Sequence, residues 1–448
     1  MSNPVIVVST GMTTMTHDAA PVIDHAAAAR QAEAAARIRR RLRPLYAASW
    51  VLGINLWVPV EKLFLSQIGF TAATVGLLAA AYAAAVPFLE IPSGILADRW
   101  SRRGVLTIAN LALAGSALVG GLSTNVPTYL AAALLLGVYF ALHSGTIDSI
   151  IYDVLAEETG HSDGFEKYLG RVQLWQGAAL VASALAGGAI AALTSPRTTY
   201  FLTMPFALLS IGALTRFHEP RLHKASEALP LRRQITTTYR TIAGRGRLRL
   251  IITTMVLSAL LLQLLLEFGP LWMVALAAPA IVYGPQWAGL MSAVGLGGVL
   301  AGRITLTRPP ALTAAITAML AASLTLTTSH NPVAVIAAQV VLALVLVAAS
   351  TLLTRLLHDE IPSSLRAGVS SGAGTLTWMA FLPFALGFGF LTRHSGVYTA
   401  AWMLVAATAA ACAALLHLTM SRHPDTSPGH RALPTTSGPP TSPAQAEC

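Results

Sequence analysis

About a dozen apolar stretches, each long enough to cross a membrane as a helix, run through this chain of 448 residues. A spanning helix needs roughly 20 mostly apolar residues, and it suits the bilayer core because its backbone groups bond within the segment. Only 11% of the residues are charged, against ~25% in soluble domains. The predicted fold class is therefore an all-α polytopic membrane protein with 12 transmembrane helices. The predicted spans are 45–66, 73–97, 105–123, 127–151, 170–193, 199–216, 250–272, 286–305, 311–328, 332–355, 368–391 and 397–419.

The basic residues predict which way the spans run. Of the 29 Lys and Arg, all except Lys62, Arg197 and Arg393 fall in segments on one side of the predicted bundle. Cytoplasmic loops carry an excess of Lys and Arg, so we expect a multi-pass protein of the plasma (inner) membrane with both termini in the cytoplasm. The net charge of +10 is explained by these loops, and we expect no nucleic-acid partner.

The longest interior connection, 217–249, is predicted to be a cytoplasmic loop that divides the chain into two sets of six spans. The N-terminal half covers 45–216 and the C-terminal half covers 250–419. Residues 1–44 form a basic cytoplasmic tail in this interpretation. Residues 420–448 are rich in Pro, Ser and Thr, a composition that predicts a disordered cytoplasmic tail.

A weak internal repeat favours two pseudo-symmetric six-helix halves. In the first half Pro59 precedes Gly76, and in the second half Pro270 precedes Gly289 at a similar distance. Both glycines lie near the start of a predicted span and are followed by leucine. The sequence therefore predicts that the two halves are homologous.

The loop after the second span narrows the class of protein. It reads Gly94-Ile-Leu-Ala-Asp98-Arg99-Trp-Ser-Arg102-Arg103, which resembles the signature loop of the major facilitator superfamily, with serine in place of one glycine. The resemblance covers about 45–420 and implies a secondary transporter that works by alternating access. It also implies that Asp98 and Arg102 form a conformational latch. In the alternative interpretation, the arginines only keep this loop in the cytoplasm.

A weaker resemblance points to the drug and metabolite efflux branch of that superfamily. It rests on Glu90-Ile-Pro-Ser-Gly94 and on Asp148-Ser-Ile-Ile-Tyr-Asp153. It implies export of small hydrophobic drugs or metabolites in exchange for protons. Two patterns of proton-coupled members are missing, since span four carries His143 and no basic residue, and the glycine pattern of span five lacks its proline. An importer or permease of a small metabolite therefore remains an alternative.

Other functional classes fit the sequence less well. The chain has no His-Glu-x-x-His motif, and its two cysteines suggest neither a disulfide framework nor a metal site. We therefore expect no enzyme, no metal and no cofactor. A non-transporting sensor would need a large cytoplasmic domain, which the short tails and loops do not provide. The expected partners are a small-molecule substrate, the lipid bilayer and protons as coupling ion, and we expect a monomer.

Acidic residues inside predicted spans are the first candidates for proton or substrate binding, because ionisable groups within a membrane are costly and usually functional. Glu267 lies four residues after Gln263, so both share one face of span seven. Glu61 lies at a similar depth in span one, and the repeat predicts that both acids face one central cavity. A carboxylate there could carry a proton or attract a cationic substrate. Alternatively, the adjacent Lys62 only neutralises Glu61.

Three further ionisable residues have structural alternatives. Glu90 is predicted to support the signature loop or to carry protons, and Asp148 to pair with a loop arginine or to bind protons. His143 shares one face of span four with Tyr139 and is predicted to be a hydrogen-bonded packing residue or a proton site. Aromatic and amide side chains of the spans suit a broad apolar substrate pocket, although they equally suit helix packing. These cavity candidates are Asn55, Trp57, Tyr139, Gln173, Gln176 and Trp378.

Overall fold

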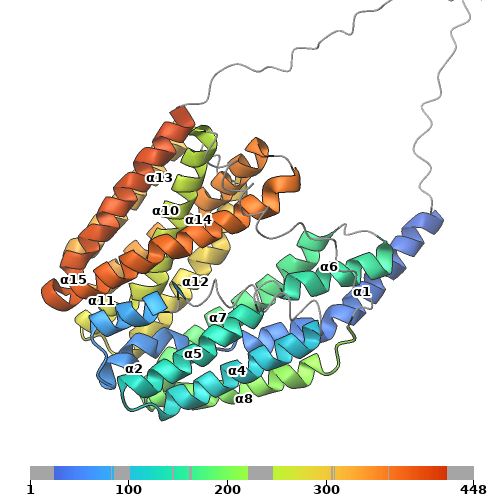
Figure 1. Cartoon of the computed structure of the whole chain (residues 1–448), viewed down its shortest axis with the longest axis horizontal. Coiled ribbons are helices and arrows are strands. Elements are labelled where there is room, and N and C mark those ends of the chain that lie inside the picture. The colour runs from blue at the N-terminus through green and yellow to red at the C-terminus, as the bar shows by residue number, and fades with distance from the viewer. Residues whose placement is uncertain are drawn as a thin grey trace, which may run out of the picture.

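The computed structural model describes residues 25–81, 83–84, 101–143, 146–160, 164–219, 246–303, 306, 308–361 and 363–420 (Figure 1). Most of these residues are helical, and the described residues form no strand. The elements are α1 (His25–Leu52), η1 (Val58–Val60), α2 (Glu61–Gln67), a helix at Ala72–Ala81, α4 (Arg102–Leu122), α5 (Val126–His143), α6 (Thr146–Thr159), α7 (Phe165–Leu193), α8 (Pro196–Leu214), α10 (Gly246–Phe268), α11 (Pro270–Ala275), α12 (Ala280–Arg303), α13 (Pro309–Thr328), α14 (Pro332–Glu360) and α15 (Ser363–Met420).

Apart from short breaks in spans one and seven, each predicted span coincides with helix wherever the structure describes it, and span two is described only near its start, where the helix Ala72–Ala81 lies. This confirms the all-α fold class. Seven helical stretches within the described residues are long and apolar enough to cross a membrane. The last of these contains two predicted spans, and Gly396 with its left-handed φ of 83° separates them inside α15. Helix α1 begins at His25, well before the predicted start of span one at 45, because the alanine-rich segment ahead of that span has high helix propensity.

Two predicted spans are broken helices. Span one leaves α1 after Leu52 and resumes at η1, where Pro59 lies, before α2 begins. Span seven breaks at Gly269, and Pro270 opens the short α11. Proline cannot donate a backbone hydrogen bond and clashes with the preceding turn, so it ends or kinks a helix. The two prolines of the predicted repeat therefore occupy equivalent breaks in the two halves.

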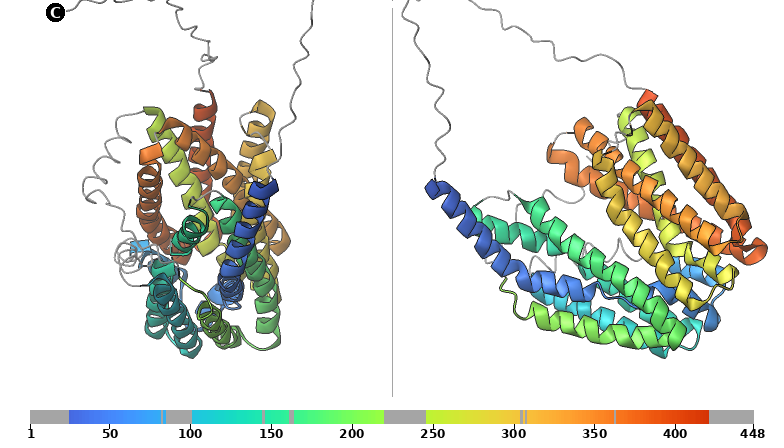
Figure 2. Two further views of the ribbon diagram at one scale, coloured as in Figure 1. Left: turned by 90° about the vertical axis from the view of Figure 1, so that its right-hand side faces the viewer. Right: turned by 180° about the vertical axis from the view of Figure 1, so that it is seen from behind.

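The helices assemble into two bundles. One half contains α1 to α8 and the other contains α10 to α15 (Figure 1). The two halves converge beside α2, α11 and α12, and they diverge toward the end where the described chain begins and stops, as the view from behind also shows (Figure 2). We call these the converging end and the terminal end of the molecule.

Close backbone contacts join the halves at two places. Helix α7 packs on α12, where a Cβ at Gly188 would lie 2.7 Å from the backbone nitrogen of Gly284. The helix Ala72–Ala81 meets α15, where a Cβ at Gly76 would lie 2.6 Å from the carbonyl oxygen of Ala385. Helix α2 also packs on α11. Small residues allow such approach, as is common between membrane helices.

Candidate substrate-binding site

A cavity of about 520 Å³ lies between the two halves. Ligand pockets in proteins commonly measure ~300–1,000 Å³, so the cavity suits a small organic molecule. Both halves supply its walls, and most of the lining is aromatic or aliphatic. The polar and aromatic residues of the lining include Asn55, Trp57, Glu61, Lys62, Tyr129, Tyr139, Phe140, Gln176, Tyr200, Gln263, Glu267, Trp287 and Trp378.

A charged triad in the cavity wall crosses from one half to the other. The Lys62 ammonium donates to Glu61 Oε2 at 2.8 Å within α2, and to Glu267 Oε1 at 2.5 Å in α10. The Lys62 side chain is 4% exposed, whereas those of Glu61 and Glu267 are 17% and 24% exposed. The lysine therefore lies behind the two carboxylates, and both carboxylates reach the cavity.

Two tyrosines fix the orientation of Glu61. The Tyr129 hydroxyl, from α5, donates to Glu61 Oε1 at 2.8 Å and lies 3.0 Å from the hydroxyl of Tyr200, from α8. Both tyrosines are buried. Glu61 thus accepts a hydrogen bond at each carboxylate oxygen, while Glu267 accepts the Lys62 bond at Oε1. Of the two acids, Glu267 is the more exposed and the less tightly bound.

Polar side chains satisfy the backbone at both helix breaks, which is necessary because water is scarce at membrane depth. In span one, Asn55 N–H donates to Ser183 Oγ and Leu56 N–H donates to Thr203 Oγ1. In span seven, the Gln339 side-chain amide donates to the Gly269 carbonyl. These bonds hold the broken segments that carry Trp57, the triad and Pro270 against the cavity.

Aromatic rings form much of the cavity wall. Trp57 stacks on Tyr200 with ring centroids 5.2 Å apart, and Trp378 makes an edge contact with Phe381. The indole nitrogens of Trp57 and Trp287 are buried and have no hydrogen-bond partner among the residues that the structure describes. The cavity therefore combines π surfaces, which attract cations, with two carboxylates.

The cavity brings together many of the predicted site residues, from both halves of the chain. Those that line it are Asn55, Trp57, Glu61, Tyr139, Gln176, Gln263, Glu267 and Trp378. Gln173 does not line it and is exposed on α7. Asp148 is exposed on α6, and His143 lies outside the lining with its ring 5.2 Å from that of Tyr139. The described residues contain no group of His, Cys, Asp and Glu that could hold a metal.

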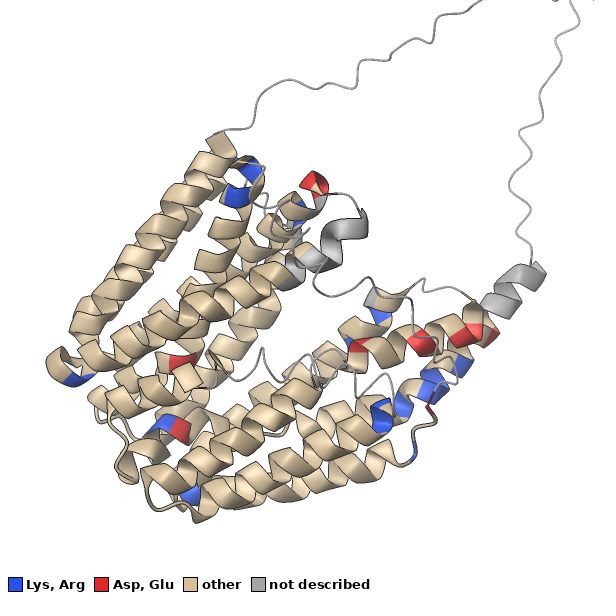
Figure 3. Ribbon diagram, viewed as in Figure 1, with Lys and Arg blue, Asp and Glu red and all other residues tan. Residues whose placement is uncertain are grey.

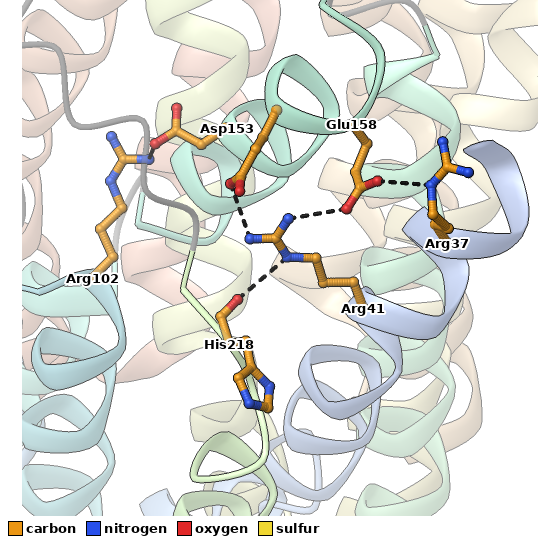
Figure 4. A network of polar contacts seen from close by, with 7 residues as sticks. Arg37, Arg41, Arg102, Asp153, Glu158 and His218 are labelled. Atoms are coloured by element: carbon orange, nitrogen blue, oxygen red, sulfur yellow. Dashed lines mark hydrogen bonds and ion pairs between the residues drawn. The ribbon is translucent and has the colours of Figure 1, made fainter.

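The signature loop is described only at its end, since Glu90, Gly94, Asp98 and Arg99 lie outside the described residues. Arg102 begins α4 and forms an ion pair with Asp153 of α6 (Figure 4). Its guanidinium also donates to the Ser149 carbonyl at 2.7 Å. Its neighbour Arg103 donates to the carbonyl of Phe217. These contacts tie α4, α6 and the end of α8 together within the N-terminal half.

The N-terminal extension of α1 joins the same network. Arg41 forms ion pairs with Glu157 and Glu158 at 3.0 and 3.1 Å, and Arg37 pairs with Glu158 at 3.2 Å (Figure 4). Arg41 also donates to the His218 carbonyl at 3.5 Å. The basic segment that we predicted as a tail is therefore helical from His25 and bound to the end of α6.

Arg102→Ala is expected to lower the free energy of unfolding by about 3 kcal/mol, because it removes a mostly buried cation that forms an ion pair with the mostly buried Asp153. Both side chains of this pair are 13% exposed. Arg37→Ala is the matched control, and it should cost less than about 1 kcal/mol because Arg37 is 56% exposed. Thermal unfolding of the purified variants in detergent measures both effects. Equal losses for the two variants would contradict this ranking.

Sequence reasoning did not identify the cavity residues that surround Glu61. Lys62 was considered only as a neutralising neighbour of Glu61, yet it bridges to Glu267, which is 205 positions away in the sequence. Tyr129 and Tyr200 follow Pro127 and Pro196 at the starts of α5 and α8. Tyrosine near the end of a span usually indicates an interfacial position, so nothing in the pattern pointed to a bond with Glu61.

Two helical bundles around a central cavity, with broken helices beside it, define a membrane protein of the secondary-transporter class. Residues 45–378 match the family model described as Major Facilitator Superfamily. The chain belongs to the major facilitator superfamily.

Solved structures share this fold at low sequence identity. The nucleoside transporter NupG is 12% identical with a TM-score of 0.67, covering 86% of this chain and 98% of that one. A bacterial homologue of the human lysosomal transporter Spinster, in an inward-facing and unoccupied conformation, is 13% identical with a TM-score of 0.67, covering 86% and 97%. The xylose transporter XylE from E. coli is 14% identical with a TM-score of 0.63, covering 88% and 98%. No curated protein matches the sequence.

Proposed function

We propose that this protein is a secondary active transporter that works by alternating access and exports small hydrophobic drugs or metabolites in exchange for protons. The observation that carries the proposal is the cavity between the halves, whose largely aromatic and aliphatic walls include the two carboxylates Glu61 and Glu267. The aromatic and aliphatic lining favours a hydrophobic substrate, and Glu267 is the carboxylate best placed to exchange a proton because it is the more exposed of the two.

The proposed direction of transport depends on how the protein is oriented in the membrane. In the proposed topology the terminal end faces the cytoplasm of a plasma (inner) membrane and the protein acts as a monomer. The distribution of charge supports this orientation, because Lys and Arg gather at the terminal end (Figure 3). The halves diverge at that end (Figure 1), and in the proposed mechanism a substrate enters from the cytoplasmic side.

The amides of the cavity favour a second candidate function. Asn55, Gln176 and Gln263 line the cavity and offer hydrogen bonds of the kind that suit hydroxyl-bearing substrates. The fold is shared with a nucleoside transporter and with a D-xylose–proton symporter. Uptake of such a polar metabolite on the same fold is therefore the alternative to export.

Accumulation in cells tests the proposed function. The protein is produced in an efflux-deficient host, which is loaded with a panel of labelled lipophilic compounds, with and without a protonophore. Cells with the protein should retain several-fold less of at least one compound, and the protonophore should remove the difference. Parallel assays with labelled nucleosides and pentoses test the alternative. Equal retention of the whole lipophilic panel, together with uptake of a polar metabolite, would overturn the export proposal in favour of the importer.

A further inference from the structure

Lys62 occupies an unusual position for a charged residue in a membrane protein. Its side chain is 4% exposed, and its ammonium lies between a carboxylate of its own helix and a carboxylate of the opposite half. Among the described residues, the hydroxyls of Tyr129 and Tyr200 and the side-chain amide of Gln263 also lie at this site. The Arg197 guanidinium lies 5.5 Å from the Phe64 ring centroid nearby. Arg197 is not part of the cavity lining and donates to the Ser123 carbonyl.

The charges of the triad do not cancel. Two carboxylates and one ammonium leave a single negative charge in the cavity wall when both acids are ionised. Glu61 is held by Lys62 and Tyr129, so the partly exposed Glu267 is the group that can accept a second cation. Aromatic walls next to such a carboxylate favour an organic cation over a small hydrated ion.

We propose that the Lys62 ammonium is a covalently attached counter-ion, which occupies the position at Glu267 where a cationic substrate would bind. This inference rests on the proposed function. The site then accepts lipophilic molecules with one positive charge, and binding of such a molecule releases the contact between the halves. Lys62 thereby determines both the charge of the substrate and the closure of the converging end.

The energetics of buried ion pairs favour such an exchange. Desolvation offsets most of the Coulomb attraction in a buried pair, so replacing one cation by another costs little, whereas removing a partner outright is expensive. A substrate cation at Glu267 would leave Lys62 paired with Glu61, so no buried charge loses all its partners. The link that is lost is the one between α2 and α10, at the end where α2 packs on α11 of the opposite half.

Binding of probes that differ in charge tests the substrate class. Purified protein is heated in detergent with tetraphenylphosphonium, with neutral triphenylphosphine oxide or with anionic tetraphenylborate, and the concentration giving half-maximal stabilisation is measured. Only the cation should stabilise the wild type. Lys62→Met removes the internal competitor and should lower the required cation concentration about tenfold, which corresponds to ~1.4 kcal/mol. Glu267→Gln should abolish the cation effect.

Labelling of a buried reporter tests the closure. Met273 is fully buried on α11, so Met273→Cys is introduced with Cys412 and Cys448 replaced, and its reaction with a maleimide is timed in lipid nanodiscs. Lys62→Met and Glu267→Gln should each speed labelling about tenfold, and tetraphenylphosphonium should speed it in the protein that retains the triad. The charge swap Lys62→Glu with Glu267→Lys restores an ion pair between the halves and should return labelling to the slow rate.

The outcomes separate this proposal from the proposed function. Equal stabilisation by the neutral or anionic probe, or no gain in cation binding by Lys62→Met, would overturn the assigned role of Lys62. Fast labelling of the swapped variant would overturn the closure, and that variant keeps the test valid if Lys62→Met fails to fold. If cation binding and slow labelling of the charge-swapped variant are both observed while cells export nothing, the proposed export is wrong and the role of Lys62 stands.

Discussion

Glu267→Gln is expected to reduce proton-driven export at least about tenfold, to the retention seen in cells without the protein. The amide has nearly the same shape as the carboxylate but neither takes up a proton nor carries a charge, so it removes the exchangeable acid of the cavity with little change in packing. In the proposed cycle, the Glu267 carboxylate binds the substrate when it is deprotonated and releases it when it takes up a proton. The amide of glutamine can do neither. Accumulation of a transported compound in the efflux-deficient host measures the effect.

The control for this variant is the same chemical change outside the cavity. Glu360 ends α14, pairs with Arg247 at 2.8 Å and has a side chain that is 31% exposed. Glu360→Gln should leave export within about twofold of the wild type, because exposed ion pairs contribute little. Normal export by Glu267→Gln would exclude Glu267 as the coupling residue and make Glu61, with its bonds to Lys62 and Tyr129, the next candidate.

Gly188→Ala is expected to weaken the contact between the halves by about 1–3 kcal/mol, as overpacking of a tight interface does. The new methyl would lie 2.7–2.8 Å from backbone atoms of Gly284. Backbone atoms cannot rotate away, so α7 and α12 must separate. Faster labelling of the Met273→Cys reporter and a lower unfolding temperature in detergent should both follow.

Gly170→Ala is the matched control on the same helix. A Cβ at Gly170 meets nothing within 4 Å, and alanine is favoured over glycine inside a helix by about 1 kcal/mol. Gly170→Ala should therefore leave the stability of the protein unchanged or raise it slightly, whereas Gly188→Ala should lower it. Equal behaviour of the two variants would show that the α7–α12 contact does not hold the halves together.

Contacts between residues that are far apart in the chain explain which parts of the site could not be predicted from the sequence. Glu267 stands out because an acid in an apolar run is costly, and Gln263 shares a helix face with it, so local patterns identify both residues. Lys62 and Tyr129 become informative only through partners far away in the chain. Gln173 shows the opposite error, since it lies one helical turn from Gln176 on α7 but is exposed and does not line the cavity.

The sequence by itself determined the membrane class, the positions of the spans and the superfamily, because hydrophobic length and a short loop motif are local properties. It also indicated that Pro59 and Pro270 are equivalent positions of a repeat. Only the tertiary structure decided that the helices break at these prolines and that Lys62 joins Glu61 to Glu267 across the two halves. That arrangement depends on how two separately folded bundles meet, and the periodicity of a single helix carries no information about its partner in the other bundle.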